Sequence, residues 1–244
     1  MIIKELEGKN IAIVAMGESQ LDFHLSLIHS NVYDEVWGIN CMGAITKCDR
    51  VFMLDPVSRF MDTDDAGTQT GIMRRWLPKA DCPIYTCELD DRCPSAVLYP
   101  LEEVAQATDC AYLNNTVPYA FAFALYNKVK SLNLFGIDFS YKGNIHFAEA
   151  GRGCCEFWLA KCIEAGMIIN VAPRSGLLDT NSPLEERIYG YHRLDDPDIL
   201  IIDSEGTYRQ VKLSWYNEKL KEEQLKNITE IRTVIDGPPE AKRY

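Results

Sequence analysis

The sequence of 244 residues predicts an α/β fold, a three-layer sandwich around a mostly parallel central sheet, with a C-terminal α/β extension. Short apolar runs of strand length alternate with longer helix-like stretches, as in a doubly wound sheet. Most of these runs end in a polar residue, which is typical of parallel strands whose carboxyl ends line one crevice. The pattern changes after residue 181, so we expect a main domain over 1–181 and an extension, 182–244, that packs on it.

The expected strands of the main domain are short, apolar and bounded by turn residues. They cover 10–15, 35–40, 50–54, 83–87, 111–113, 132–137 and 167–172. Helices are expected at 20–30, 117–130 and 148–165. Residues 57–79 are polar and fit either a mobile segment near the site or a solvated loop with a short helix. In the extension, 199–202 is expected to be a strand and 211–232 a late helix.

Composition narrows the class of protein. The 47% hydrophobic content supports a packed core, and the net charge of −11 argues against duplex nucleic acid as a partner. No apolar run approaches the length of a membrane-spanning helix, and the charged N-terminus does not resemble a signal peptide. The nine cysteines include no CxxC motif, so we expect reduced thiols in a cytoplasmic protein rather than a zinc site.

Polar residues at the ends of the first three strands are candidate ligand-binding groups. Backbone N–H groups of the turn that holds Gly17 and Ser19 would favour a phosphate or carboxylate, although Ser19 fits an N-cap equally well. Asn40 can bind a ribose hydroxyl or a base edge, or it is a turn asparagine. Asp55 could bind a metal, a ribose or an acceptor, or it simply starts a turn before Pro56.

The later strand ends add further candidates. Asn114, Asn115 and Thr116 precede a helix, and Ser175 follows the last strand of the main domain. The segment 132–146, LNLFGIDFSYKGNIH, changes from apolar to polar at Asp138 and then delivers Tyr141 and His146. A histidine in such a loop can act as a general base, and a tyrosine hydroxyl can stabilise a leaving phosphate. The nearest positive charges for a phosphate are Lys142 and Arg152.

The motifs VFMLDP, NNTVPYAFAFAL, LNLFGIDFSYKGNIH and NVAPRSGLL, together with a GxS turn and a strand that ends in asparagine, resemble a Rossmann-like superfamily. It includes the bacterial Cst-type sialyltransferases, the flagellin-glycosylating motility accessory factors and the archaeal MptE-like 6-hydroxymethylpterin diphosphokinases. The resemblance covers about residues 10–178. It implies nucleotide binding by Gly17, Ser19 and Asn40, a phosphate-side hydroxyl from Tyr141 and a histidine base at His146. The usual GxGPS turn is altered here, with alanine for the first glycine and glutamate for proline.

The leading hypothesis is a transferase that binds a nucleotide-activated donor, a nucleotide sugar, and uses His146 as general base without a metal or other cofactor. One alternative is a diphosphokinase that uses ATP and Mg²⁺, with Asp55 and Asp138 beside the metal. Another is a nucleotide-binding protein without catalysis. The acceptor stays unknown, and the apolar helices around Ala120 and Phe157 fit a core or a homo-oligomer interface equally well.

Overall fold

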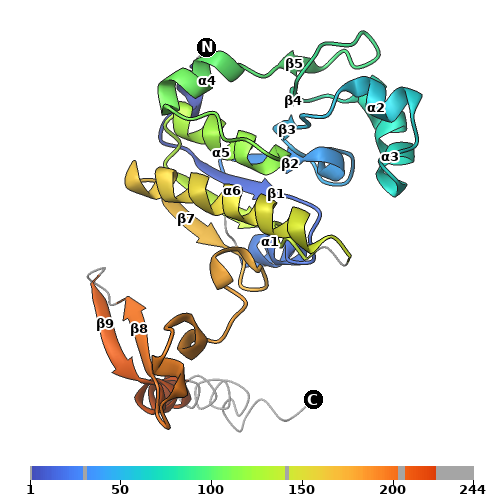
Figure 1. The fold of residues 1–244 in the computed structure, drawn as a ribbon. Helices are drawn as coiled ribbons and strands as arrows, with labels where there is room; N and C mark the ends of the chain where they lie inside the picture. The colour runs from blue at the N-terminus through green and yellow to red at the C-terminus, as the bar shows by residue number, and fades with distance from the viewer. Residues whose placement is uncertain (1, 30–31, 141–142, 203–206, 224–244) are drawn as a thin grey trace, which may run out of the picture. The chain divides into compact units, whose positions relative to one another are not determined.

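The computed structural model describes residues 2–29, 32–140, 143–202 and 207–223. The chain divides into two compact units, Met1–Asn181 and Ser182–Tyr244, and each is described by itself. The first unit is a parallel sheet flanked by helices on both faces (Figure 1). This arrangement confirms the predicted α/β, Rossmann-like class.

Seven strands form the sheet of the first unit, in the order β5-β4-β3-β2-β1-β6-β7, and all neighbouring strands are parallel. Their bounds are β1 Asn10–Val14, β2 Glu35–Ile39, β3 Arg50–Phe52, β4 Ile84–Thr86, β5 Ala96–Leu98, β6 Ser131–Phe135 and β7 Ile168–Val171. The chain runs outward from β1 to β5 and then returns to place β6 on the other side of β1. The point between β1 and β6 is therefore the topological switch point, where open α/β sheets bind ligands.

Helices cover both faces of this sheet. The α-helices are α1 Gln20–Ile28, α2 Val57–Asp62, α3 Thr68–Trp76, α4 Leu101–Thr108, α5 Thr116–Tyr126 and α6 Ile145–Glu164. Short 3₁₀ segments are η1 Lys4–Leu6, η2 Asn40–Ala44, η3 Leu77–Lys79 and η4 Leu177–Asp179. Helices α4, α5 and α6 share one core with Ile11, Trp37 and Leu132 of the strands. On the opposite face, Phe23 of α1 packs against Val14.

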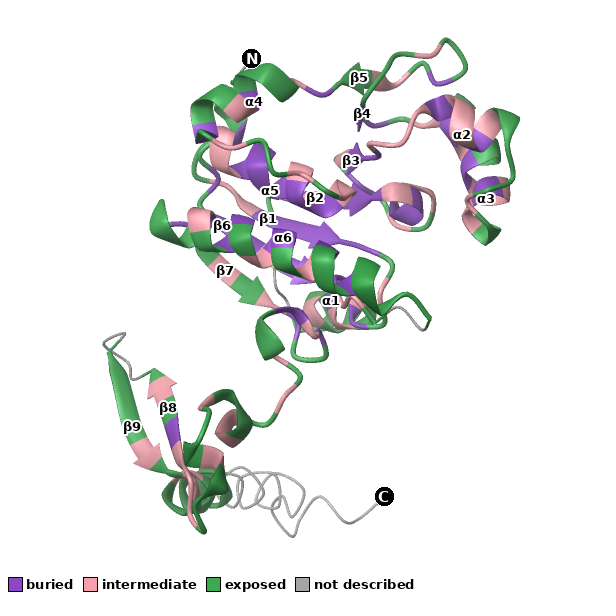
Figure 2. Ribbon diagram, viewed as in Figure 1, coloured by how far each residue is buried: buried purple, intermediate pink, exposed green. Residues whose placement is uncertain are grey.

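Burial of the central strands explains their uninterrupted apolar sequence. Residues 11–14 of β1 are all buried, because helices cover the strand on both sides (Figure 2). Alternate residues of β3 divide between two cores, with Phe52 on the side of α5 and Val51 on the side of α2 and α3. The strands that sequence reasoning identified most directly are thus the ones with both faces covered.

One expectation about the main domain is wrong, and another is incomplete. Residues 111–113 form no strand, because side chains of α6 hydrogen-bond to their backbone in place of a neighbouring strand. The Tyr112 carbonyl accepts hydrogen bonds from Trp158 Nε1 at 2.6 Å and from Cys154 Sγ at 3.3 Å. Residues 57–79 contain more helix than the one short helix that was expected, and their mobility stays a prediction. They contain α2 and α3, which bury Phe60 and Met73. Edge strand β5 and helix α4 were not expected at all.

A buried carboxylate lies at the amino-terminal edge of the sheet. Glu35, the first residue of β2, accepts hydrogen bonds from Arg50 Nε and Trp37 Nε1, both at 2.8 Å, and from Lys9 Nζ at 3.0 Å. Burial acts to raise the pKa of Glu35. The hydrogen bonds from Arg50, Trp37 and Lys9 together lower it by more than burial raises it, so the pKa lies below its ordinary value. Arg50 also donates to the Tyr85 hydroxyl oxygen at 3.1 Å, so these groups tie three neighbouring strands together.

The second unit contains an antiparallel hairpin of β8 (Asp198–Ile202) and β9 (Tyr208–Lys212), preceded by 3₁₀ segments η5 (Leu184–Arg187) and η6 (Tyr191–Arg193). Residues 213–223 are helical, and residues 224–232 of the expected late helix lie outside the described residues. Residues 211–212 belong to β9, so the helix begins later than predicted. Among the described helices of the whole chain, none has the length and apolarity needed to cross a membrane.

Candidate functional site

A cavity of about 590 Å³ lies at the carboxyl ends of β1, β2, β3 and β6, at the switch point of the sheet. Its walls include residues 15–18 and 136–140, which follow β1 and β6, residues 39–40 at the end of β2, and residues 114–117 at the start of α5. Seven of the residues expected at strand ends line it: Gly17, Asn40, Asp55, Asn114, Asn115, Thr116 and Asp138. The polar residues that the sequence distributes over more than a hundred positions therefore do meet at one site.

Ser19 and Asp138 bind each other beneath this cavity. The Ser19 hydroxyl donates to Asp138 Oδ1 and accepts from the Gly136 N–H at 2.8 Å, while the Ser19 N–H donates to Asp138 Oδ2 at 2.8 Å. Ser19 holds the N-cap position of α1 but makes no side-chain cap bond to the helix, and it is fully buried, so its hydroxyl is not exposed to a ligand. Its hydrogen bonds instead join the turn after β1 to the segment after β6.

We expect Ser19→Ala to lower the free energy of unfolding by about 1–3 kcal/mol, because the buried Gly136 N–H loses its acceptor and Asp138 loses one of its donors. Urea denaturation measures this change. Ser140→Ala is the matched control: Ser140 lies on the same segment after β6 but is exposed, so its substitution should stay within about 0.5 kcal/mol of the parent. Equal stabilities of the two variants would contradict the structural role of Ser19.

The glycines of the two joined segments leave no room for a side chain. A Cβ on Gly17 would lie 2.4 Å from Asp138 Oδ2 and 2.7 Å from the Gly136 carbonyl oxygen. Gly136 has a φ of +69°, and a Cβ there would lie 2.1 Å from the Ala15 carbonyl oxygen. The Gly17 N–H donates to the Gly136 carbonyl at 2.8 Å. Gly17 is therefore needed for close backbone approach.

Asn40 presents an unsatisfied polar atom at this site. Its backbone is left-handed, with φ of +52°, at the point where β2 passes into η2. Its Oδ1 is buried without a hydrogen-bond partner in the described part of the chain. A non-glycine residue in this conformation costs about 1–3 kcal/mol, and such residues cluster at ligand sites. A ligand that donates a hydrogen bond to Oδ1 would satisfy the orphaned acceptor.

The start of α5 forms another wall. Asn115 is the N-cap, and its side chain accepts from the Val117 N–H at 3.1 Å. Asn114 Nδ2 donates to the Ala150 carbonyl at 2.9 Å and so holds this helix start against α6. Both asparagines thus have structural roles while they line the cavity. Because the positive end of the α5 dipole faces the cavity, this wall favours an anionic group.

Sequence reasoning missed four side chains that line the cavity: Arg59, Gln69, Phe139 and Phe147. Arg59 and Gln69 lie on α2 and α3, in the segment that was not assigned to the fold. The i, i+4 spacing of Asp55 and Arg59 was the signal that could have identified this pair. Arg59 Nη1 donates to Asp55 Oδ1 at 2.5 Å, and its Nε donates to Asp65 Oδ1 at 3.1 Å. These hydrogen bonds, that to Asp55 first, raise the pKa of Arg59.

The remaining predicted residues lie elsewhere. Ser175 is buried under the segment after β6, where its hydroxyl donates to the Ile137 carbonyl at 2.7 Å. His146, in the first turn of α6, is fully exposed, and its Nδ1 lies 4.0 Å from Glu149 Oε2. It is not among the residues that line the cavity, although its neighbour Phe147 is. Arg152 pairs with Glu156 and Asp179. Tyr141 and Lys142 lie outside the described residues.

The described residues offer neither a metal site nor a reactive buried thiol. Among the described residues, no group of three or more histidine, cysteine, aspartate or glutamate side chains is placed to hold a metal ion. All nine cysteines are free thiols, and Cys87 is the exposed one. Burial raises the pKa of Cys162 to about 12, and it holds Cys155 well above its ordinary value, so neither is suited to act as a thiolate.

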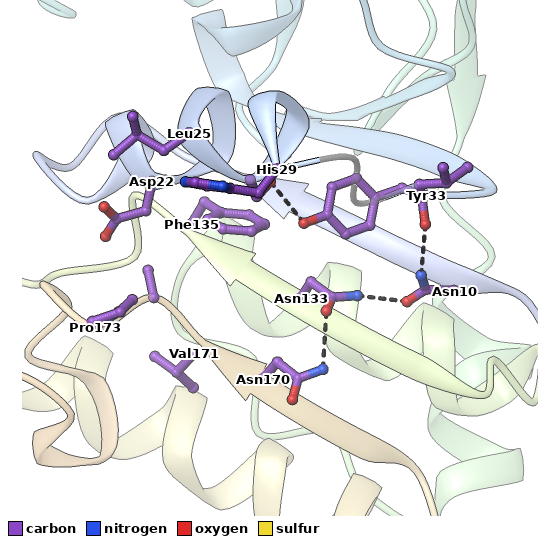
Figure 3. Close-up of a pocket in the computed structure, with 13 residues that line it drawn as sticks. Asn10, Asp22, Leu25, His29, Tyr33, Asn133, Phe135, Asn170, Val171 and Pro173 are labelled. Atoms are coloured by element: carbon purple, nitrogen blue, oxygen red, sulfur yellow. Dashed lines mark hydrogen bonds between the residues drawn. The ribbon is translucent and has the colours of Figure 1, made fainter. Parts of the chain in front are cut away.

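A second cavity, of about 570 Å³, lies between α1 and strands β1, β6 and β7 (Figure 3). A row of amides crosses its floor: Asn170 Nδ2 donates to Asn133 Oδ1 at 2.9 Å, and Asn133 Nδ2 donates to Asn10 Oδ1 at 2.6 Å. None of the predicted site residues lines this cavity. The cavity at the switch point is therefore the candidate functional site.

The chain matches no family model and no curated protein. Among solved structures it is similar to the sialyltransferase CstII from Campylobacter jejuni, solved in complex with the substrate analogue CMP-3FNeuAc. The TM-score is 0.45 at 18% sequence identity, and the match covers 68% of this chain and 81% of that chain. A likeness of this degree assigns no activity to the chain.

Proposed function

We propose that the chain is a transferase that binds a nucleotide-activated donor, a nucleotide sugar, in the cavity between β1 and β6. The observation that carries the proposal is the convergence of Gly17, Asn40, Asp55, Asn114, Asn115, Thr116 and Asp138 on one cavity at the switch point. The motifs that resemble a nucleotide-using superfamily fall on the same strand ends.

The walls of the cavity suit different parts of such a donor. Asn40 and Gln69 offer amides that can hydrogen-bond a base or ribose, and Phe147 offers an aromatic surface. Asp138 and Glu18 are acceptors for ribose or sugar hydroxyls. The start of α5 favours the phosphate. Transfer breaks the bond between the anomeric carbon of the sugar and the phosphate oxygen, and forms a bond between that carbon and the acceptor oxygen. The nucleotide leaves with its phosphate, and the acceptor hydroxyl loses its proton to a base.

The binding step is tested by a thermal-shift screen of CMP, UDP, GDP, ATP and several nucleotide sugars, each with and without Mg²⁺. A ligand at a hundred times its Kd stabilises the folded protein by about 2.7 kcal/mol. A shift with one pyrimidine nucleotide that is unchanged by a chelator supports a glycosyltransferase. No shift with any of these compounds would contradict the proposal.

We propose His146 as the general base, since it adjoins Phe147 of the cavity wall and has a fully exposed imidazole. His146→Ala should bind the donor with unchanged Kd and lose transfer by about 10²- to 10⁴-fold. A pH–rate profile should lose its acidic limb in this variant. His24→Ala is the control, because His24 is an exposed histidine on α1 that does not line the cavity, and it should keep full activity. Retained transfer in His146→Ala would remove His146 from the mechanism.

The carboxylates of the cavity favour a second candidate, an ATP-dependent diphosphotransferase. Mg²⁺ is commonly held by one or two carboxylates together with substrate phosphates, and Asp55 and Asp138 are placed on the same cavity. The bound metal would neutralise phosphate charge. Stabilisation by ATP only in the presence of Mg²⁺ would favour this activity over the glycosyltransferase.

A further inference from the structure

Arg59 is the one cation among the described residues that line the switch-point cavity. Two carboxylates hold it: Asp55 accepts from Nη1, and Asp65 accepts from Nε. No partner of Nη2 occurs in the described part of the chain, so Arg59 keeps donors for a further acceptor. An arginine with spare donors beside a ligand cavity is suited to bind a phosphate.

The turn after β1 is poorly suited to the same task. Its Gly17 N–H donates to the Gly136 carbonyl, and its Ser19 N–H donates to Asp138, so these amides are already used inside the fold. Glu18 and Asp138 place two carboxylates on this wall. A phosphate here would meet like charge and few available donors.

We propose that Arg59, with the start of α5, binds the phosphate of the donor, and that the turn holding Gly17 and Ser19 does not. This inference rests on the proposed nucleotide binding and assigns the phosphate position within that site. It places the base and ribose toward Asn40 and the wall that holds Glu18 and Asp138. Arg59 is then the side chain that distinguishes phosphorylated from unphosphorylated ligands.

The two carboxylates on Arg59 have different roles. Asp65 is 62% exposed and belongs to the connection between α2 and α3, so its ion pair with Arg59 is screened by water. Asp55 is 31% exposed, lines the cavity and orients the guanidinium from the preceding turn. An incoming phosphate should displace Asp65 and leave Asp55 in place, because bidentate binding of Arg59 to a phosphate is the stronger interaction.

Isothermal titration of cytidine, CMP and CDP, and of uridine, UMP and UDP, tests the proposal. In the parent protein each phosphate should tighten binding. Arg59→Gln should weaken the monophosphate and diphosphate by roughly tenfold to a hundredfold and leave the nucleoside Kd unchanged. Asp65→Asn should have the opposite effect and tighten the phosphorylated ligands severalfold, because it frees Arg59. This opposite sign separates a phosphate contact from a loss of folding.

Arg92→Gln is the matched control. Arg92 pairs with Asp62 at the end of α2 and with Asp90, and it does not line the cavity. Its substitution therefore removes the same charge as Arg59→Gln without removing a contact to the ligand. It should leave the difference between nucleoside and nucleotide unchanged. If Arg59→Gln keeps the full difference in affinity between nucleoside and nucleotide, this inference alone is overturned. If the parent protein binds none of these compounds and none of the nucleotides and nucleotide sugars of the thermal-shift screen, the proposed function falls and this inference with it.

Discussion

Gly136→Ala is expected to lower the free energy of unfolding by about 2–5 kcal/mol. A left-handed backbone costs alanine about 1–2 kcal/mol, and overpacking adds about 1–3 kcal/mol. The added Cβ would lie 2.1 Å from the Ala15 carbonyl oxygen, which belongs to the backbone and cannot turn away. The segments after β1 and β6 must therefore separate, which breaks the 2.8 Å hydrogen bond from the Gly17 N–H to the Gly136 carbonyl.

Urea denaturation of Gly136→Ala measures this loss, and nucleotide titration should show weaker binding, because the same two segments form the cavity walls. Gly153→Ala is the matched control. Gly153 is exposed in α6, and no atom outside its own helix backbone lies within 4 Å of the added Cβ, so alanine should stabilise the helix by roughly 0.5–1 kcal/mol. A Gly136→Ala protein as stable as the parent would show that the two segments can separate without cost.

Glu35→Ala should lower the free energy of unfolding by about 3–5 kcal/mol, because it leaves the mostly buried Arg50 without its carboxylate. The side chains of Glu35 and Arg50 are 9% and 15% exposed, so water compensates little. Denaturation at neutral pH measures the loss. The cluster lies at the edge of the sheet opposite the cavity, so nucleotide affinity of the folded variant should not change. Altered affinity at unchanged stability would contradict this separation of roles.

Glu35 also predicts a pH dependence. Its folded pKa lies below the ordinary value of 4.5, so the unfolded chain binds its proton first as the pH falls. The stability from Glu35 is therefore fully present above pH 4.5 and is lost as the pH falls through the folded pKa. Glu35→Ala should show a shallower acid loss of stability than the parent. If the free energy of unfolding falls equally steeply with pH below 4.5 in the two proteins, other carboxylates determine the acid sensitivity.

The sequence predicted those parts of the fold that pattern alone determines. Strands β1 and β6 are covered on both faces, so their apolar runs are unambiguous. Edge strand β5 is a short apolar run of three residues that are partly buried or exposed, and it was not recognised as a strand. Residues 111–113 looked like a strand, but contacts with α6 decide their conformation. Long-range contacts of this kind are not encoded in local periodicity.

The candidate site was predicted in outline and not in its internal contacts. Strand ends identified the cavity because parallel strands bring their carboxyl ends to one edge. Which side chains face the cavity depends on pairings across the chain: Ser19 bonds Asp138, 119 positions away, and is thereby removed from the ligand. Arg59 was missed because its segment was interpreted as a mobile stretch or as a solvated loop with a short helix. The role of His146 stays a prediction.

The hydrogen bonds beneath the cavity divide its residues into two groups with different freedom to vary. Gly17, Ser19, Gly136 and Asp138 hold each other, so a change at one of them disturbs the others. Arg59, Gln69 and Phe147 line the cavity from helices α2, α3 and α6 and make none of these hydrogen bonds with the four residues. Mutations on these helices can change ligand preference without loss of the fold. Variants selected for a new donor should therefore accumulate in α2, α3 and the first turn of α6.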